Sequence, residues 1–229
     1  MSEPVRIFLA GDSTVQTYGP EQAPQAGWGQ YIGEFFQPGT EIVNRAMAAR
    51  SSRTFVKEGR LASILRGIRP GDWLFIQMGH NDASRDKPER YTSPETEFPR
   101  YLSLYLDGAR DRGAFPLLIT PIARLHYENG AFQNDFPAYC AAMKRLGRRR
   151  NVPVIDLMGL WLRRLEQAGP ETARTWYMAA VNGTDKTHFN EGGAWEAAAV
   201  LAEGIRGSGL PIARRLNEKR KEKGYAYNL

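Results

Sequence analysis

The apolar residues of the chain fall into short continuous runs separated by longer segments of mixed polarity. A run without polar alternation is typical of a strand that is buried on both faces of a parallel sheet. The predicted strands are Val5–Ala10, Glu41–Asn44, Trp73–Met78, Phe115–Thr120 and Val152–Ile155.

Between these runs, apolar residues recur at the three- and four-residue spacing of a helix face. The predicted helices are Gly29–Phe36, Arg60–Ile68, Phe98–Arg112, Phe136–Arg149 and Gly192–Ile205, with a further helical segment within Pro170–Val181. Strands that alternate with helices imply right-handed βαβ units. We therefore predict an α/β fold, a three-layer α/β/α sandwich with a five-stranded parallel sheet.

The length of 229 residues and the apolar fraction of 42% are sufficient for one well-filled core. We interpret 1–229 as a single domain, with 214–229 as a basic C-terminal tail. No run approaches the roughly 18 apolar residues of a membrane span, so no membrane partner is expected. The single Cys140 and the absence of a secretory pattern favour a cytoplasmic location, with secretion as the alternative if a signal segment has been removed.

The formal net charge is +6, and two regions concentrate the basic residues: the tail and the segment Lys144–Arg150. Such charge runs are most often solvated surfaces, although a polyanion could also be attracted to them. Aromatic residues do not alternate with these charges as a base-stacking surface requires, so nucleic acid is not expected as a partner.

Three islands of reactive side chains stand out: Gly11–Thr14, Gly79–Asp82 and Asp185–His188. The first two follow predicted strands, and ligands of open parallel sheets bind beyond the carboxyl ends of the strands. Ser13 and Asn81 should therefore meet at one sheet edge, where the third island must join them. Together they supply the serine, histidine, aspartate and asparagine of a serine esterase.

Each residue has a specific expected task. His188 can take the proton of Ser13, and Asp185, three residues earlier, can orient the imidazole. Asn190 is a good helix N-cap, which leaves the loop before it free for chemistry. The Asn81 amide can donate to an oxyanion together with backbone N–H groups of Ser13 and of the segment 48–50. The structural alternatives are a helix cap at Ser13 and a turn at Asn81.

A metal-dependent phosphoesterase is a second reading of the same islands. It would use Asp12, His80, Asp82 and His188 as ligands. No compact ligand spacing such as His-Glu-x-x-His is present, so we predict neither a metal nor a cofactor.

The motifs resemble those of the SGNH (GDSL-like) hydrolase superfamily over most of the chain. Gly-Asp-Ser-Thr, Arg50-Ser-Ser-Arg-Thr-Phe55, Gly-His-Asn-Asp and Asp-Lys-Thr-His-Phe are most similar to the rhamnogalacturonan acetylesterases. The resemblance implies a flavodoxin-like fold, a catalytic triad and an oxyanion hole. The triad would be Ser13, His188 and Asp185, and the hole would comprise Ser13, Ala49 and Asn81. The family usually has glycine at the position of Ala49, where only a backbone N–H is needed. Alanine can therefore serve if its φ is negative, and would be strained if the site requires a positive φ.

The implied function is removal of O-acetyl groups from carbohydrate, most similar to that of enzymes acting on acetylated pectin. Acetylxylan esterase, lipase and thioesterase activities are alternatives within the superfamily. The expected partner is thus an acetylated carbohydrate, and the sequence gives no prediction of oligomeric state. Side chains expected to line the sugar site are Tyr18, Trp28, Arg124, His126 and Tyr127.

Overall fold

A parallel sheet of five strands forms the centre of the computed structural model, which describes residues 4–218. The strands are β1 (Val5–Ala10), β3 (Thr40–Asn44), β4 (Trp73–Gln77), β5 (Phe115–Ile119) and β8 (Val154–Ile155). Their order in the sheet is β3-β1-β4-β5-β8, and every neighbouring pair is parallel. The predicted strands and the α/β fold class are confirmed.

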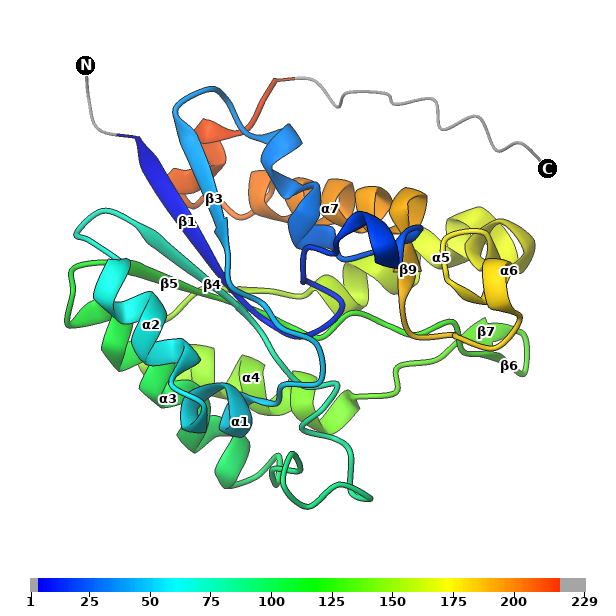
Figure 1. The fold of residues 1–229 in the computed structure, drawn as a ribbon, viewed down its shortest axis with the longest axis horizontal. Coiled ribbons are helices and arrows are strands. Elements are labelled where there is room, and N and C mark those ends of the chain that lie inside the picture. The colour runs from blue at the N-terminus through cyan, green and yellow to red at the C-terminus, as the bar shows by residue number, and fades with distance from the viewer. Residues whose placement is uncertain (1–3, 219–229) are drawn as a thin grey trace.

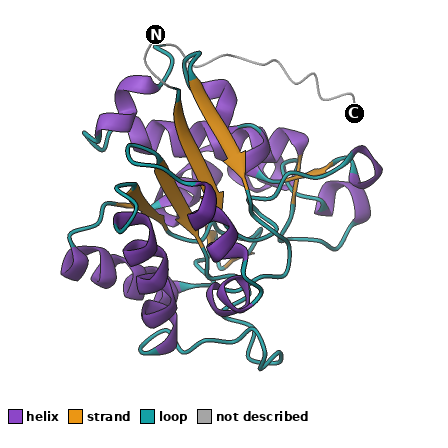
Figure 2. Ribbon diagram, turned by 60° about the vertical axis from the view of Figure 1, so that its left-hand side comes forward, coloured by secondary structure: helices purple, strands orange, loops and turns teal. Residues whose placement is uncertain are grey.

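Helices cover both faces of this sheet (Figures 1 and 2). One face carries α1 (Ser52–Lys57), α2 (Arg60–Gly67), α3 (Glu97–Arg110) and α4 (Pro137–Arg150). The other carries α5 (Leu157–Arg174), α7 (Glu191–Arg206) and the short 3₁₀ helices η2 (Trp28–Gln30) and η3 (Ile32–Phe35). The result is the predicted three-layer sandwich.

Smaller elements lie outside the three layers. The 3₁₀ segments η1 (Pro20–Gln22) and η4 (Pro211–Arg215) and the single-turn helix α6 (Ala179–Asn182) sit in connections. Two antiparallel pairs complete the list: β2 (Gln25–Ala26) with β9 (Phe189–Asn190), and β6 (Tyr127–Glu128) with β7 (Ala131–Phe132).

The central strands are buried because their side chains are apolar on both faces. Ile7, Leu9, Leu74 and Ile76 are each 0% exposed. Leu117 on β5 is equally buried. Edge strand β3 is only half-buried, which agrees with its more polar sequence. The sheet core therefore sits under β1, β4 and β5, the first two of which lead into the reactive islands.

Two predicted helices differ from the structure. Gly29–Phe36 forms η2 and η3 instead of one helix, broken at Tyr31. The segment Pro170–Val181 belongs partly to α5, which starts much earlier, at Leu157, and bends at Gly169, where φ is +77°. Only glycine adopts this backbone conformation readily, and Pro170 follows it. Gly169 and Pro170 therefore interrupt the helical pattern of the sequence at the bend in α5.

The basic regions are only partly described. The tail expected over 214–229 lies outside the described residues from 219 onward, while Asn217 N donates to Phe35 O at 2.9 Å and holds that end against η3. In α4, Lys144, Arg145 and Arg150 form ion pairs with Asp156, Glu95 and Asp107, respectively. Within residues 4–218, the helices are too short or too polar to cross a membrane.

Candidate active site

The site lies where the strand order reverses, since β1 has β3 on one side and β4 on the other. The loops after these three strands bring Ser13, Ala49 and Asn81 to one hollow of about 420 Å³, and His188 reaches it from the segment before α7. The remaining lining residues are Tyr18, Gln22, Gln25, Ala48, His80, Ser84, Lys87, Arg90, Arg124 and Thr187.

A hydrogen-bonded relay connects three of the predicted residues. His188 Nε2 is 2.9 Å from Ser13 Oγ, although the two residues are 175 positions apart in sequence. His188 Nδ1 is 2.8 Å from Asp185 Oδ2. With Nδ1–H donating to the carboxylate, Nε2 is the acceptor for the serine hydroxyl. The structure therefore brings Ser13, His188 and Asp185 together in the order that proton transfer requires.

The segment around Asp185 fixes this carboxylate by hydrogen bonds to both oxygens. Oδ1 accepts from the backbone N–H groups of Thr187 and His188, at 2.9 and 3.0 Å, and Oδ2 accepts from the ring. Partial burial acts to raise the pKa of Asp185, but these hydrogen bonds outweigh it and hold the pKa below its usual value. Asp185 therefore remains ionised beside the imidazole.

One helix cap and two backbone pairings fix the histidine segment at the site. Asn190 caps α7 as predicted, because its side chain accepts from Gly193 N at 3.0 Å. β9 pairs with β2, which follows the serine loop in sequence. Leu125 N donates to Lys186 O at 2.8 Å and joins the loop after β5. The position of His188 thus depends on segments from three parts of the chain.

The serine loop is a tight turn after β1. Asp12 Oδ1 accepts from Thr14 N at 2.9 Å and from Thr14 Oγ1 at 2.8 Å, and Tyr18 Oη donates to Ser13 O at 2.8 Å. Burial raises the pKa of Tyr18 to about 12, which keeps its hydroxyl a neutral donor. Ser13 is 8% exposed, and its hydroxyl faces the hollow.

Three donors surround the hollow beside Ser13. Within residues 4–218, no acceptor is bonded to the N–H of Ser13 or of Ala49. One hydrogen of the Asn81 amide is donated to Arg50 O at 3.1 Å, which leaves the second hydrogen for a ligand. These are the groups that an oxyanion hole requires.

Ala49 has a φ of +65°, in the left-handed region that favours glycine. Of the two cases considered for alanine, relaxed at a negative φ or strained at a positive φ, the structure shows the second. Gln16 supports this turn, because its Oε1 accepts from Ala48 N at 2.5 Å.

Two of the residues considered as metal ligands, Asp82 and His80, are hydrogen-bonded to other protein groups. Asp82 accepts from Ser52 N at 3.0 Å, from Ser52 Oγ at 2.5 Å and from Thr92 Oγ1 at 2.6 Å. His80 Nε2 lies 2.9 Å from Ile122 O, and burial lowers its pKa. Across the described part of the chain, no group of three or more His, Cys, Asp and Glu is arranged to hold a metal ion.

The predicted sugar-site residues divide into three groups. Tyr18 and Arg124 line the hollow, and His126 and Tyr127 line an adjoining one that also contains Arg124. Trp28 is a correction: it is 1% exposed and its indole donates to Gln77 Oε1 at 2.9 Å, so it belongs to the core. The bulky ring of Trp28 packs inward because α7 covers η2, the element that carries it.

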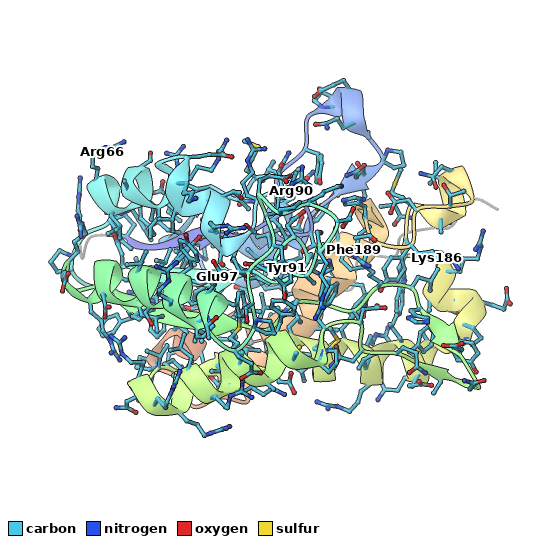
Figure 3. The ribbon with its side chains drawn as sticks, turned by 90° about the horizontal axis from the view of Figure 1, so that it is seen from below. Arg66, Arg90, Tyr91, Glu97, Lys186 and Phe189 are labelled. Carbon is cyan, nitrogen blue, oxygen red and sulfur yellow. The ribbon has the colours of Figure 1, made fainter. Side chains whose placement is uncertain are left out.

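Two basic residues are among the lining side chains that were not predicted from the sequence. Lys87 and Arg90 come from the loop between β4 and α3, and Figure 3 labels Arg90 there and Lys186 on the segment before α7. The loop carries polar and basic residues without periodicity, so its sequence does not indicate which side chains turn toward Ser13.

Comparison with known proteins identifies the family. Residues 7–201 match the model of the GDSL-like Lipase/Acylhydrolase family. The chain belongs to this family. The resemblance to GDSL-like hydrolases inferred from the motifs is thereby confirmed.

Two relatives match along nearly their whole length, and one solved structure matches along part of its own. The probable rhamnogalacturonan acetylesterase YesY of Bacillus subtilis (strain 168) is 52% identical over 93% of this chain and 98% of its own. The rhamnogalacturonan acetylesterase RhgT of the same organism is 41% identical over 94% and 96%. The crystal structure of YxiM from Bacillus subtilis superposes with a TM-score of 0.81 at 28% identity, covering 91% of this chain, which spans 58% of that protein.

Proposed function

We propose that this chain is a serine esterase that removes O-acetyl groups from carbohydrate, with acetylated rhamnogalacturonan or its oligosaccharides as substrate. Membership of the GDSL-like family supports ester hydrolysis. The names of the two near full-length relatives support the sugar and the acetyl group. The observation that carries the proposal is the Ser13–His188–Asp185 relay, with distances of 2.9 and 2.8 Å.

In the first half of the proposed reaction, Ser13 Oγ attacks the acetyl carbonyl carbon while His188 Nε2 takes the hydroxyl proton. Asp185, which stays ionised, stabilises the imidazolium that forms. The carbonyl oxygen becomes an oxyanion and accepts from Ser13 N–H, Ala49 N–H and the Asn81 amide. The bond to the sugar oxygen then breaks, and His188 returns the proton to that oxygen.

In the second half, water takes the place of the sugar hydroxyl. His188 accepts a proton from water as the water oxygen attacks the acetyl group on Ser13. The second tetrahedral intermediate uses the same three donors. Its collapse releases acetate and returns the proton to Ser13 Oγ, so that the enzyme is restored.

The hollow favours a sugar over a lipid. Most of its lining residues carry amide, hydroxyl, imidazole or charged groups, and Ala48 and Ala49 are the two without a polar side chain. A long acyl chain needs a predominantly apolar channel, whereas a sugar ring needs polar groups and a limited number of apolar contacts. The lipase alternative is therefore disfavoured by the lining.

Acetate release from a panel of substrates tests the proposed function. Acetylated rhamnogalacturonan oligosaccharides should be hydrolysed with a higher kcat/KM than acetylated xylan oligosaccharides or p-nitrophenyl acyl esters of eight or more carbons. Ser13→Ala is the control for contaminating esterase, and labelling by a fluorophosphonate should be lost with it. A clear preference for xylan or for long acyl esters would reject the proposed substrate, and metal-dependent, Ser13-independent activity would reject the serine mechanism.

A further inference from the structure

The hollow around Ser13 carries an uncompensated positive charge. Lys87, Arg90 and Arg124 all line it, and no aspartate or glutamate is among its lining residues. None of these three side chains belongs to the proposed triad or oxyanion hole. In a site with partial exclusion of water, such charges favour an anionic ligand over a neutral one.

Arg124 is the best placed of the three. It follows β5 and lines both the hollow at Ser13 and the adjoining hollow at His126 and Tyr127. Its guanidinium carbon lies 5.0 Å from the centre of the Phe136 ring, which restricts the plane of the group. Its Nε is buried and has no hydrogen-bond partner among residues 4–218.

Nearby carboxylates are engaged with histidines rather than with Arg124. In the adjoining hollow, Asp135 Oδ1 is 2.8 Å from His126 Nδ1, and Asp185 is bonded to His188. Over the described residues, Arg124 forms no ion pair within 4 Å. Its positive charge is thus available to a ligand that reaches the space between the two hollows.

Lys87 and Arg90 extend the positive charge on the loop between β4 and α3, and Figure 3 labels Arg90 on this loop. Arg90 Nε lies 3.5 Å from Glu89 Oε1, but Glu89 is 65% exposed, so water weakens this pair. The loop is anchored by Thr92, whose Oγ1 donates to buried Asp82 at 2.6 Å. These two side chains are therefore held at the site while their charges remain accessible.

We propose that Arg124, assisted by Lys87 and Arg90, forms a carboxylate-binding subsite that recognises a uronic-acid unit of the sugar whose acetyl group is removed. A guanidinium can donate two parallel hydrogen bonds to a carboxylate, and its stacking on Phe136 orients the donors. The subsite rests on the proposed function, and it explains how the enzyme would distinguish a uronate polymer from a neutral one. Arg124 acts here in substrate specificity, not in the transfer of protons.

Paired substrates isolate the recognition of charge. One is an acetylated galacturonate oligosaccharide, and the other is the same compound with its carboxylates converted to methyl esters. For the unmodified enzyme we expect kcat/KM to be at least ~10-fold higher on the acid, mainly through KM. In Arg124→Gln the ratio of the two kcat/KM values should fall by about 10- to 100-fold, with partial recovery in Arg124→Lys.

Arg85→Gln is the control because it removes one positive charge from the loop that carries Lys87 and Arg90 without touching the hollow. The Arg85 guanidinium lies 5.7 Å from the Tyr91 ring and does not line the site. Its acid-to-ester ratio should stay within about twofold of the unmodified enzyme. A similar ratio in Arg124→Gln and Arg85→Gln would overturn the subsite.

Failure of the subsite and failure of the proposed function give different results. If the unmodified enzyme hydrolyses the acid and the methyl ester equally well, the subsite is wrong and the acetylesterase function stands. This measurement needs no variant and so does not depend on the folding of Arg124→Gln. If neither sugar is hydrolysed while other esters are, the proposed function is wrong, and the subsite is overturned with it.

Discussion

At the scale of single residues, the three members of the hydrogen-bonded relay have different roles. In the proposed mechanism Ser13 forms the covalent bond and His188 moves the proton, whereas Asp185 acts through the ring of His188. Asp185 also accepts two backbone N–H groups of its own loop. Its removal would therefore affect both the orientation of the imidazole and the shape of the loop.

Replacement of Ser13 or His188 by alanine should lower kcat for acetate release by at least ~10⁴-fold. Ser13→Ala removes the group that forms the acyl-enzyme, and His188→Ala removes the group that transfers the proton. Asp185→Ala should cost less, about 10²- to 10⁴-fold, because the other two members can still act. Steady-state kinetics on one acetylated oligosaccharide measures the series, with circular dichroism as the folding control. Wild-type rates in both His188→Ala and Asp185→Ala would contradict the assignment.

Ala49 combines a backbone role with an unfavourable conformation. Alanine in the left-handed region costs roughly 1–2 kcal/mol, and glycine removes this cost but loses about 0.4–1 kcal/mol to the greater freedom of the unfolded chain. Ala49→Gly should therefore raise the free energy of unfolding by up to about 1 kcal/mol, measured by urea denaturation.

Asn151→Gly is the control for this change. Asn151 also has a positive φ, +50°, at the end of α4, and asparagine tolerates that region better than alanine. Its stabilisation should be smaller. A larger gain at Asn151 than at Ala49 would show that the Ala49 turn is not strained.

At the scale of elements, buried Asp82 joins α1 to the loop that follows β4. Its carboxylate accepts from the first residue of α1, Ser52, and from Thr92. Burial raises the pKa of Asp82 to about 6, despite these hydrogen bonds. The unfolded chain has the ordinary aspartate pKa near ~3.9, so the folded protein holds this proton more tightly.

The sign of the pH effect follows from that difference. The stabilising contribution of protonated Asp82 is complete below pH ~4 and is lost as the pH rises through about 6. Relative to Asp82→Asn, the unmodified protein should therefore lose about 3 kcal/mol of unfolding free energy between pH 4 and pH 7. Urea denaturation of both proteins at three pH values measures the change, and a constant difference would disprove the raised pKa.

The elements that could be predicted from sequence are those with long, uniform patterns. β1 was predicted at its observed bounds because Val5–Ala10 is apolar throughout and stays in the sheet centre. α1 was missed because it has only six residues, too few to show a periodicity, and is started by the Ser51 capping box. β2 and β9 have two residues each, and only their pairing in space defines them.

The same distinction applies to the site. Ser13, Asn81 and His188 could be predicted because each stands beside a recognisable strand end or helix cap. The left-handed φ of Ala49 could not, since it depends on how the segment after β3 turns around Gln16. The inward direction of Lys87 and Arg90 depends on the tertiary anchoring of their loop.

At the scale of the whole molecule, the positive charge is distributed in two distinct ways. Several cations of α4 are paired with acidic neighbours, while those at the catalytic hollow are largely unpaired. α4 ends near Asn151 and Val152, at the end of the sheet away from Ser13. The net charge of +6 therefore does not describe the field that a substrate meets.

Raising the salt concentration from 50 to 500 mM should lower kcat/KM for an acidic acetylated oligosaccharide by several-fold, because mobile ions screen the unpaired cations at the hollow. The methyl-esterified substrate should respond much less. Initial rates measured across this range provide the comparison. The double variant Arg148→Gln/Arg149→Gln should keep the same salt dependence, and a flattened response in it would place the relevant charge on α4 instead.

None of the hydrogen bonds described above joins the 83–97 segment to Ser13, Asp185 or His188. The β2–β9 pairing, in contrast, joins the segment that follows Ser13 to the one that follows His188. The triad segments are thus bonded to each other and not to the segment that presents Lys87 and Arg90, which is attached instead through Thr92 to Asp82, next to Asn81. Grafting 84–91 from a relative with a different sugar preference, with Thr92 kept, should exchange selectivity while leaving acetyl transfer itself in place. The substrate range of such a fold can change through substitutions and insertions in one loop, while the geometry of the triad stays the same.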